Sequence, residues 1–317
     1  MKFGVREICD VTFKTTADGQ KVGNKEFKKA GMPAFFIDTA KTSSLEQATT
    51  TVYAQGGKGY SRLIAWEGEK TMTFTVEDAL ISPMGLAVLS GAGLINANSS
   101  KKVHVHITVD VAVDESGLAT VYYADLQEET GITKTDTVFH VCCNKNIPIY
   151  GTVIDGSGAG IEFVDNDITI EGANDAQETY PVADGGNVVF NVGATYKNKI
   201  VKLDFYLAMN EGVTNIEIKP SDFGGYFYVE AQTLFRREDT GVDMAAEIIL
   251  PKVKVQSGFT FSMAASGDPS TFTFTMDAFP GYTMFDKTKK VMCVMQVIGQ
   301  DEKSTGNTNT DHEHSFQ

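Results

Sequence analysis

Threonine and large apolar residues alternate in the stretch TFTFTMD at 271–277, within a strand-rich run that covers 225–281. Phe272, Phe274 and Met276 fall on one face of an extended chain, and the three threonines fall on the other. This period of two predicts a half-buried antiparallel strand. Turn residues at 258 and 266–269 predict a hairpin that pairs 259–263 with 271–277.

A similar alternation occurs at 71–80, where the sequence reads TMTFTVEDAL. This repeated pattern is compatible with two pseudo-symmetric halves, with two strands that share one core, or with two unrelated threonine-rich strands. Gly68, between two glutamates, predicts a turn that joins 63–66 and 71–76 in a hairpin. The preceding segment 39–54 is rich in threonine and serine without clear periodicity, so we expect an extended loop, a binding arm or a locally disordered piece.

One short helix is predicted after this hairpin. Ser82 suits the N-cap, Pro83 suits the first helical position, and Gly91 suits a stop. Further strand patterns occur at 3–13, 35–37, 102–113 and 119–123, and turns separate short strands between 144 and 220.

We therefore expect a mainly β protein: an antiparallel β-sandwich or barrel with one short covering helix, plus an inserted or appended small β-sandwich. The expected core is discontinuous and comprises 1–140 and 220–300, around an inserted β-rich domain at 141–219. Residues 301–317 are polar and acidic, and we expect a mobile tail there.

Composition and charge narrow the class of protein. The chain has 317 residues, of which 42% are hydrophobic, enough for one large core or two smaller ones. Its formal net charge of -14 argues against a grip on a phosphate backbone, which relies on clustered lysine and arginine. The charge either keeps DNA from adhering or keeps a concentrated protein soluble. The four cysteines lack redox or zinc spacing, so we expect reduced, buried thiols, and no apolar stretch suits a signal peptide or a membrane span.

Candidate chemical sites are few. His104 and His106 share a face if 102–113 is a strand, and with Asp110 they offer a set of metal ligands, although strand histidines are more often solvated or hydrogen-bonded. The histidines at 312 and 314 lie in the predicted mobile tail, which cannot hold catalytic geometry. The nucleophile motif GxSxG is absent, and carboxylate pairs are expected by chance in so acidic a chain. We expect no enzyme activity, catalytic residue, cofactor or bound metal.

Two stretches resemble the tail tube proteins, or major tail proteins, of tailed bacteriophages. The first is YAQGGKGYSRLIAWEGEKTMTFTVEDALISPMGLAVLSGAG, which begins at Tyr53, and the second is LPKVKVQSGFTFSMAASGDPSTFTFTMDAFPG, which begins at Leu250. In proteins that look like this, the first stretch gives a glycine-rich loop, a strand hairpin and the covering helix, and the second gives closing strands. The resemblance covers roughly the first 100 and the last 90 residues, while the middle region departs from a compact tube protein.

The resemblance implies a structural virion protein, located in the tail and assembled in the bacterial host cytoplasm. Such proteins form stacked rings, usually hexameric, around a lumen through which DNA passes without specific binding. Its implied partners are other copies of itself and other tail proteins such as the sheath, tape measure or terminator, and it involves no membrane. We expect subunit contacts at Thr39, Thr51, Tyr53, Gly56, Gly57, Arg62 and Trp66.

Two other classes of protein are compatible with the same predicted strands. One is another virion component, such as a capsid decoration or capsid-associated protein. The other is a carbohydrate-binding β-sandwich adhesin, for which Trp66 would stack on a sugar, although a core or subunit-contact role suits a lone tryptophan better.

Overall fold

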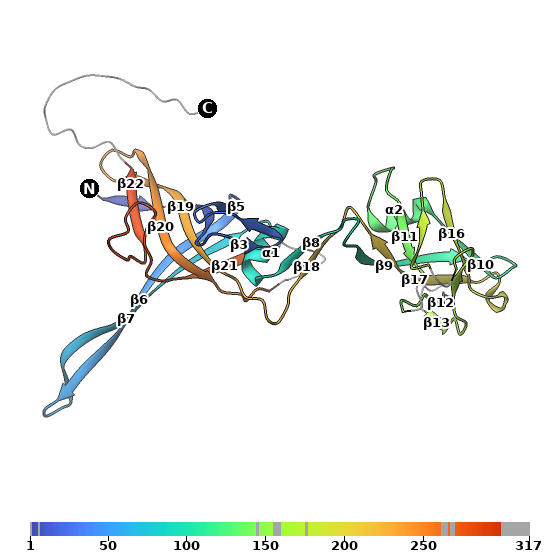
Figure 1. Ribbon diagram of the computed structural model, residues 1–317. Coiled ribbons are helices and arrows are strands. Elements are labelled where there is room, and N and C mark those ends of the chain that lie inside the picture. The colour runs from blue at the N-terminus through green and yellow to red at the C-terminus, as the bar shows by residue number, and fades with distance from the viewer. Residues whose placement is uncertain are drawn as a thin grey trace, which may run out of the picture. The chain divides into compact units, whose positions relative to one another are not determined.

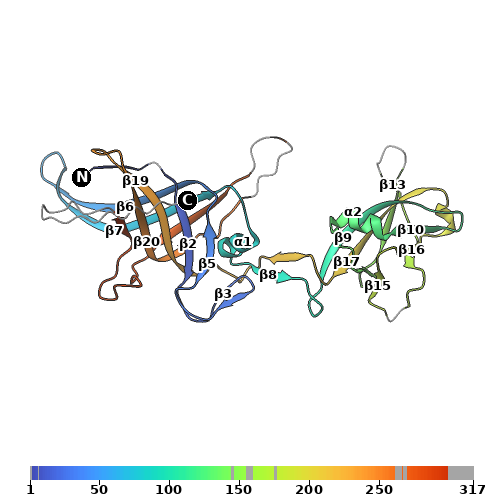
Figure 2. The same cartoon turned by 90° about the horizontal axis from the view of Figure 1, so that it is seen from above.

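The computed structural model describes residues 2–5, 7–143, 146–154, 160–174, 177–260, 266 and 270–298, with the main chain alone at 160 and 161. Two compact units make up the chain (Figures 1 and 2). Unit 1 comprises 1–93 and 218–317, and unit 2 comprises 94–217. Residues 94–140, which the sequence analysis places in the first core, therefore belong to unit 2. The physical reason is that β9 (Val103–Ala112) pairs along its whole length with β17 (Ile200–Met209), about 100 residues later.

The described part of unit 1 contains a nine-stranded sheet in the order β5-β2-β19-β20-β21-β7-β6, with β1 beside β19 and β22 beside β20. A separate small hairpin joins β3 to β4. Described neighbours in the large sheet are antiparallel, which confirms the predicted mainly β, antiparallel fold class. The strands of unit 1 are β1 Phe3–Val5, β2 Asp10–Thr15, β3 Gln20–Val22, β4 Lys25–Phe27, β5 Pro33–Ile37, β6 Ala40–Gly56, β7 Ser61–Asp78, β19 Tyr226–Arg237, β20 Asp243–Val255, β21 Phe272–Ala278 and β22 Val294–Ile298.

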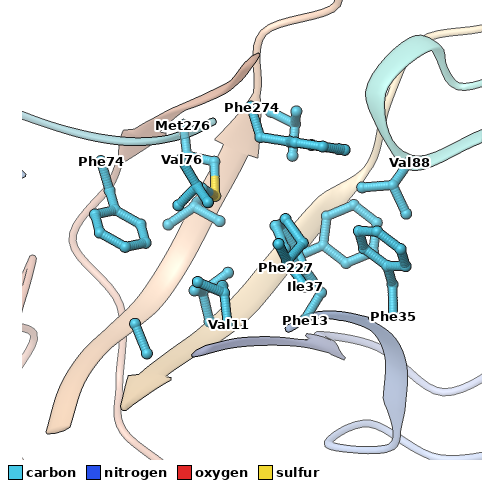
Figure 3. Close-up of a cluster of buried hydrophobic side chains, with 14 of the residues drawn as sticks. Val11, Phe13, Phe35, Ile37, Phe74, Val76, Val88, Phe227, Phe274 and Met276 are labelled. Carbon is cyan, nitrogen blue, oxygen red and sulfur yellow. The ribbon is translucent and has the colours of Figure 1, made fainter. Parts of the chain in front are cut away.

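The large sheet curls around its own hydrophobic core (Figure 3). β2 and β21 are separated by two strands, yet the ring centroids of Phe13 and Phe274 are only 6.3 Å apart. Phe35 lies 5.5 Å from the ring of Phe13 and 5.8 Å from that of Phe274, so three strands contribute to one aromatic cluster. Such a core is the main source of stability for this unit.

The alternation at 271–277 is confirmed as strand β21. Phe272, Phe274 and Met276 are buried, and β21 pairs with β7 so that Phe274 lies opposite Val76 and Met276 opposite Phe74. Among the alternatives for the repeated phrase, the two strands are thus neighbours that share one core. The predicted hairpin partner at 259–263 falls mostly outside the described residues, and the described neighbours of β21 are β20 and β7.

The predicted helix is confirmed as α1 (Pro83–Ser90). Ser82 accepts a hydrogen bond from the backbone N–H of Gly85 at 3.0 Å, and Gly91 ends the helix in the left-handed region at φ 70°. The helix packs Val88 and Leu89 into the core of unit 1. Its position as a cover on that core agrees with the sequence-based expectation.

Substitution Ser82→Ala is expected to lower the free energy of unfolding of unit 1 by about 1 kcal/mol, because it leaves a helix N–H without its acceptor. Urea unfolding followed by circular dichroism would measure the change, and Ser82→Thr, which keeps the hydroxyl, serves as the control. Equal stability of the alanine and threonine variants would contradict the capping role.

Unit 2 is a small β-sandwich. Its described part holds a six-stranded sheet in the order β13-β12-β17-β11-β15, with β9 beside β17, and a three-stranded sheet in the order β10-β16-β14. The ring centroids of Phe190 and Phe205, one from each sheet, lie 5.1 Å apart in a second core. β8 and β18, the first and last strands of this unit in the sequence, pair with each other. Besides β9 and β17, the elements are β8 Gly93–Asn96, β10 Leu118–Tyr122, α2 Tyr123–Thr130, β11 Phe139–Cys142, β12 Tyr150–Ile154, β13 Gly160–Phe163, β14 Thr169–Ile170, β15 Thr179–Val182, β16 Asn187–Asn191, a 3-10 turn Ala194–Tyr196 and β18 Thr214–Glu217.

Helix α2 is absent from the sequence-based expectations. Its start lacks a short polar N-cap residue, because Tyr122 occupies that position. The Asp125 carboxylate instead accepts a hydrogen bond from the Tyr122 backbone N–H at 2.7 Å. Leu126 is buried in the core of unit 2 and fixes the helix there.

Candidate functional site: the β6–β7 arm

A long two-stranded arm projects from the body of unit 1 (Figure 1). It is formed by the outer parts of β6 and β7, residues 47–71, and we call it the arm. Side chains are exposed on both faces from Gln47 to Tyr53 in β6 and from Ser61 to Thr71 in β7. By contrast, Phe74 and Val76, at the base of the same strand, are buried in the core. A hairpin exposed on both faces is marginally stable in water by itself, so the arm is suited to be covered by a partner.

The arm carries large apolar side chains that remain more than half exposed. Val52 pairs with Trp66 and Ala54 with Ile64, so these four side chains share one face. Trp66 is 54% exposed and Ile64 is also 54% exposed. Leu63, 65% exposed, lies at a bulge next to Ile64, where its side chain lies beside Gly56 on the face of Val52 and Ala54. Contiguous exposed apolar residues of this kind mark an interaction surface.

The tip of the arm is a tight glycine-rich turn. Gly57 and Gly59 have φ values of 80° and 90°, which favour glycine, and Tyr60 also adopts a positive φ of 54°. The Tyr60 backbone N–H donates to the Gly57 carbonyl at 3.3 Å. A tyrosine in the left-handed region is an uncommon, strained arrangement, and its side chain is 74% exposed at the tip.

Arg62 is held against the arm itself. Its guanidinium lies 4.1 Å from the ring centroid of Tyr53, which is a cation–π contact between the two strands. The contact fixes both side chains and leaves the Tyr60 ring beyond them at the tip. Order of this kind lowers the entropic cost of binding a partner.

Gly68 lies inside β7, so the prediction of a turn at 67–69 and of a hairpin between 63–66 and 71–76 is wrong. The β6–β7 pairing shifts register at Thr49/Thr51, which makes a bulge opposite Thr50. A methyl group on Gly68 would approach the Thr50 hydroxyl to 2.5 Å, and that hydroxyl accepts a hydrogen bond from the Glu69 N–H at 2.9 Å. The glycine therefore serves close strand approach at a bulge.

Of the three alternatives expected for 39–54, the extended loop and the disordered piece are wrong, because 40–54 lie in strand β6 and the outer part of that strand belongs to the arm; a binding role of the arm stays a prediction. The segment lacks apolar alternation because the arm part of the strand has no buried face, so the pattern that reveals a half-buried strand is missing. β6 is also the last strand of the described sheet, so the outer row of its backbone N–H and C=O groups has no described strand beside it.

Hydroxyl and carboxylate groups fix the base of the arm. The Thr39 hydroxyl donates to the buried Asp78 carboxylate at 2.5 Å. The hydroxyls of Thr271 and Thr42 donate to Glu77, and these hydrogen bonds hold the pKa of that carboxyl below its usual value. The carboxylates at 77 and 78 are thus part of the joint between β6, β7 and the end of β21, rather than a catalytic pair.

The structure brings six of the seven predicted contact residues together on the arm. Thr51, Tyr53, Gly56, Arg62 and Trp66 lie in β6 or β7, and Gly57 lies in the turn that joins these strands. Thr39 lies at the base, where its hydroxyl is engaged within the chain. Their role in subunit contacts stays a prediction.

Sequence reasoning missed Val52, Tyr60, Leu63 and Ile64, which are exposed apolar residues of the arm. The available signal was the run YSRLIAW at 60–66, which has too many apolar residues for a solvated hairpin. The wrong turn at 67–69 concealed it, because a hairpin covered by the core would have buried these side chains.

Chemical sites outside the arm are not assembled among the described residues. No group of three or more histidine, cysteine, aspartate or glutamate side chains there could hold a metal ion. His106 Nε2 lies 2.9 Å from Asp204 Oδ1, and Asp110 pairs with Lys202 at 2.6 Å, so two of the three predicted ligands are engaged elsewhere. The tail histidines lie outside the described residues.

The cysteine thiols are free. Cys9 and Cys142 are buried, and Cys143 and Cys293 are partly buried. Burial raises the pKa of Cys142 and of Cys293 to about 11, so these thiols stay protonated at neutral pH. In the part of the chain that the structure describes, no helix has the length and apolar character needed to cross a bilayer.

Comparison with known proteins identifies the family. The model of the YomU/Tube protein family matches residues 4–141 and 159–295. No curated protein sequence gives a significant match to the chain. The matched segments include the arm, most of the curled sheet of unit 1 and most of unit 2. Since they span most of the chain, the protein belongs to the YomU/Tube protein family, as its resemblance to phage tail tube proteins predicts.

Proposed function

We propose that the protein assembles with copies of itself into rings of six, and that these rings stack into the tube of a phage tail. The family supports a structural tube protein of the virion tail. The proposed role is mechanical and non-enzymatic: the tube encloses a channel for DNA. Assembly would take place in the cytoplasm of the bacterial host, before the tail joins the virion.

The arm is the observation that carries the proposal. It exposes apolar side chains on both faces, and its β6 strand ends the described sheet with an unmatched row of backbone hydrogen-bonding groups. An edge of this kind is a liability in a monomer and a ready contact in an assembly. When identical subunits contact each other through two different surfaces, they form a closed ring if repeated rotation from one subunit to the next returns to the first subunit. Stacked rings then make a tube.

Two kinds of contact follow from these features. The outer edge of β6 would pair with a sheet edge of the neighbour in the same ring, and the projecting arm would reach the adjacent ring. Such heterologous contacts are not self-limiting along the tube axis, so tube length requires other tail proteins, such as a tape measure and a terminator. A sheath is a further partner in tails that contract.

The net charge of -14 suits a tube for DNA. Nucleic acids bind to proteins mainly through clusters of positively charged side chains that attract phosphate groups. A channel wall with such clusters would therefore slow the passage of the genome. An acidic wall repels the phosphates and leaves DNA free to slide.

Negative-stain electron microscopy of the purified full chain at rising concentration tests the proposal. We expect hollow rods or rings that lengthen with concentration. A particle that stays monomeric at every concentration and ionic strength would contradict the proposal and favour a decoration protein, which stays small without a shell.

A further inference from the structure

The outward face of the six-stranded sheet in unit 2 carries an aromatic stripe. Its members are Phe163 on β13, Tyr150 on β12, Tyr206 on β17 and His106 on β9. The opposite face of the same sheet packs Leu203, Phe205 and Leu207 into the core, so the stripe points away from it. Phe163 is 75%, Tyr150 is 63% and Tyr206 is 38% exposed.

The strand register places these residues on one diagonal. Thr152 pairs with Phe163 and Tyr150 pairs with Asp204, two residues before Tyr206. Tyr206 in turn pairs directly with His106, and their ring centroids lie 5.4 Å apart. Diagonal neighbours in a sheet are about 7–8 Å apart, so the stripe crosses four neighbouring strands as a line of rings.

Hydrogen-bonding groups lie beside the stripe on the same face. Asp204 Oδ1 lies 2.9 Å from His106 Nε2, and Lys202 Nζ lies 2.6 Å from Asp110 Oδ1. These pairs hold polar atoms in fixed positions next to the exposed rings. Pre-positioned polar groups and aromatic rings together give a site that orients a ligand with both polar and apolar surfaces.

The charge of this face selects among ligand classes. Among the described residues of its strands, this face carries one lysine, Lys202, which is matched by Asp110, and no cluster of cations that would suit a nucleic acid. The charged pairs between the rings also break the face into separate apolar spots, unlike the continuous apolar core of a permanent protein interface. A neutral chain of sugars complements it, because sugar rings present C–H faces to aromatic rings and hydroxyls to carboxylates and amines.

We propose that this face of unit 2 binds a neutral polysaccharide, with Tyr150 and Tyr206 as stacking platforms and Asp204 and Lys202 as hydrogen-bonding groups. The length of the stripe suits several consecutive sugar units rather than one monosaccharide. The site is separate from the arm, so it would add adhesion to carbohydrate to an assembled tube. It does not rest on the ring proposal.

Affinity electrophoresis of the full chain in gels that contain dextran, mannan, xylan or a soluble β-glucan tests this inference, together with an array of neutral and acidic oligosaccharides. We expect retardation by at least one neutral polysaccharide. Tyr150→Ala and Tyr206→Ala should each weaken binding at least tenfold, while Tyr150→Phe should retain most of it.

Two control variants separate this site from other exposed aromatic residues. Tyr122→Ala changes an exposed ring on the other sheet of unit 2, and Trp66→Ala changes the arm; both should bind sugar as the parent does. Circular dichroism confirms that each variant is folded. The inference is overturned if no neutral glycan binds, if acidic glycans bind equally well, or if both tyrosine variants bind as the parent. Rod formation that fails in Trp66→Ala while sugar binding stays intact would support the role of the arm in assembly and would leave the sugar site unaffected.

Discussion

Replacement of both Ile64 and Trp66 by threonine is expected to abolish rod formation at concentrations at which the parent protein polymerises. These two side chains lie on one face of the arm, and each is 54% exposed. Threonine keeps the strand propensity of β7 and removes the apolar surface. Burial of a large apolar side chain contributes about 1.5–3 kcal/mol, and two lost contacts raise the concentration needed for assembly by roughly a hundredfold or more.

The measurement is sedimentation velocity at rising concentration, with negative-stain images of the same samples. Tyr122→Thr, which removes an exposed aromatic residue from unit 2, is the matched control and should assemble like the parent. The melting temperature of the double variant should remain within about 4 °C of the parent, since each exposed substitution seldom alters stability by more than about 0.5 kcal/mol. Normal rods from the double variant would show that this face of the arm is not a subunit contact.

Local signals made much of the fold predictable. Helix α1 was predictable because its cap, its first-turn proline and its terminal glycine are all local to the segment they delimit. The alternation in β21 was equally informative, since one face of that strand is buried and the other is not. In both cases the residues that determine the structure lie within a few positions of each other.

The arm was harder to predict because its strands have no buried face and therefore no alternation of apolar and polar residues. A strand with no buried face needs no alternation, so β6 has the composition of a loop. A glycine between two glutamates is typical of a turn. Only the close approach of Gly68 to Thr50 on the neighbouring strand shows that it lies at a bulge instead. The sequence nonetheless located the candidate contact residues, because the glycine-rich tip and the lone tryptophan are recognisable without the strand register.

The boundary of unit 2 is a non-local property. β9 has an ordinary alternating pattern, and nothing within it reveals whether its partner is in the first or the second core. The pairing of Ile107 with Phe205 decides the matter, over a separation that sequence periodicity cannot bridge. Both histidines of β9 therefore lie on unit 2, where His106 contributes to the aromatic stripe instead of a metal site.

Phe274→Ala should lower the free energy of unfolding of unit 1 by about 3–5 kcal/mol, because it opens a cavity in the aromatic cluster. Phe274 is 1% exposed and contacts Phe13 and Phe35, and neither ring can move into the space without leaving its own strand position. The loss corresponds to a fall of roughly 6–20 °C in the melting temperature of a unit of this size.

The two units have separate cores, so the effect of Phe274→Ala should be confined to one of two unfolding transitions. Hydrogen exchange followed by mass spectrometry assigns each transition: amides of β7 and β20 should lose protection in the variant, and those of β9 and β17 should not. Phe205→Ala, at a fully buried position of unit 2, is the matched control and should give the reverse pattern. If either substitution lowered the protection of both units equally, the cores would unfold as one cooperative body, and the division of the chain at 93/94 and 217/218 would have no thermodynamic meaning.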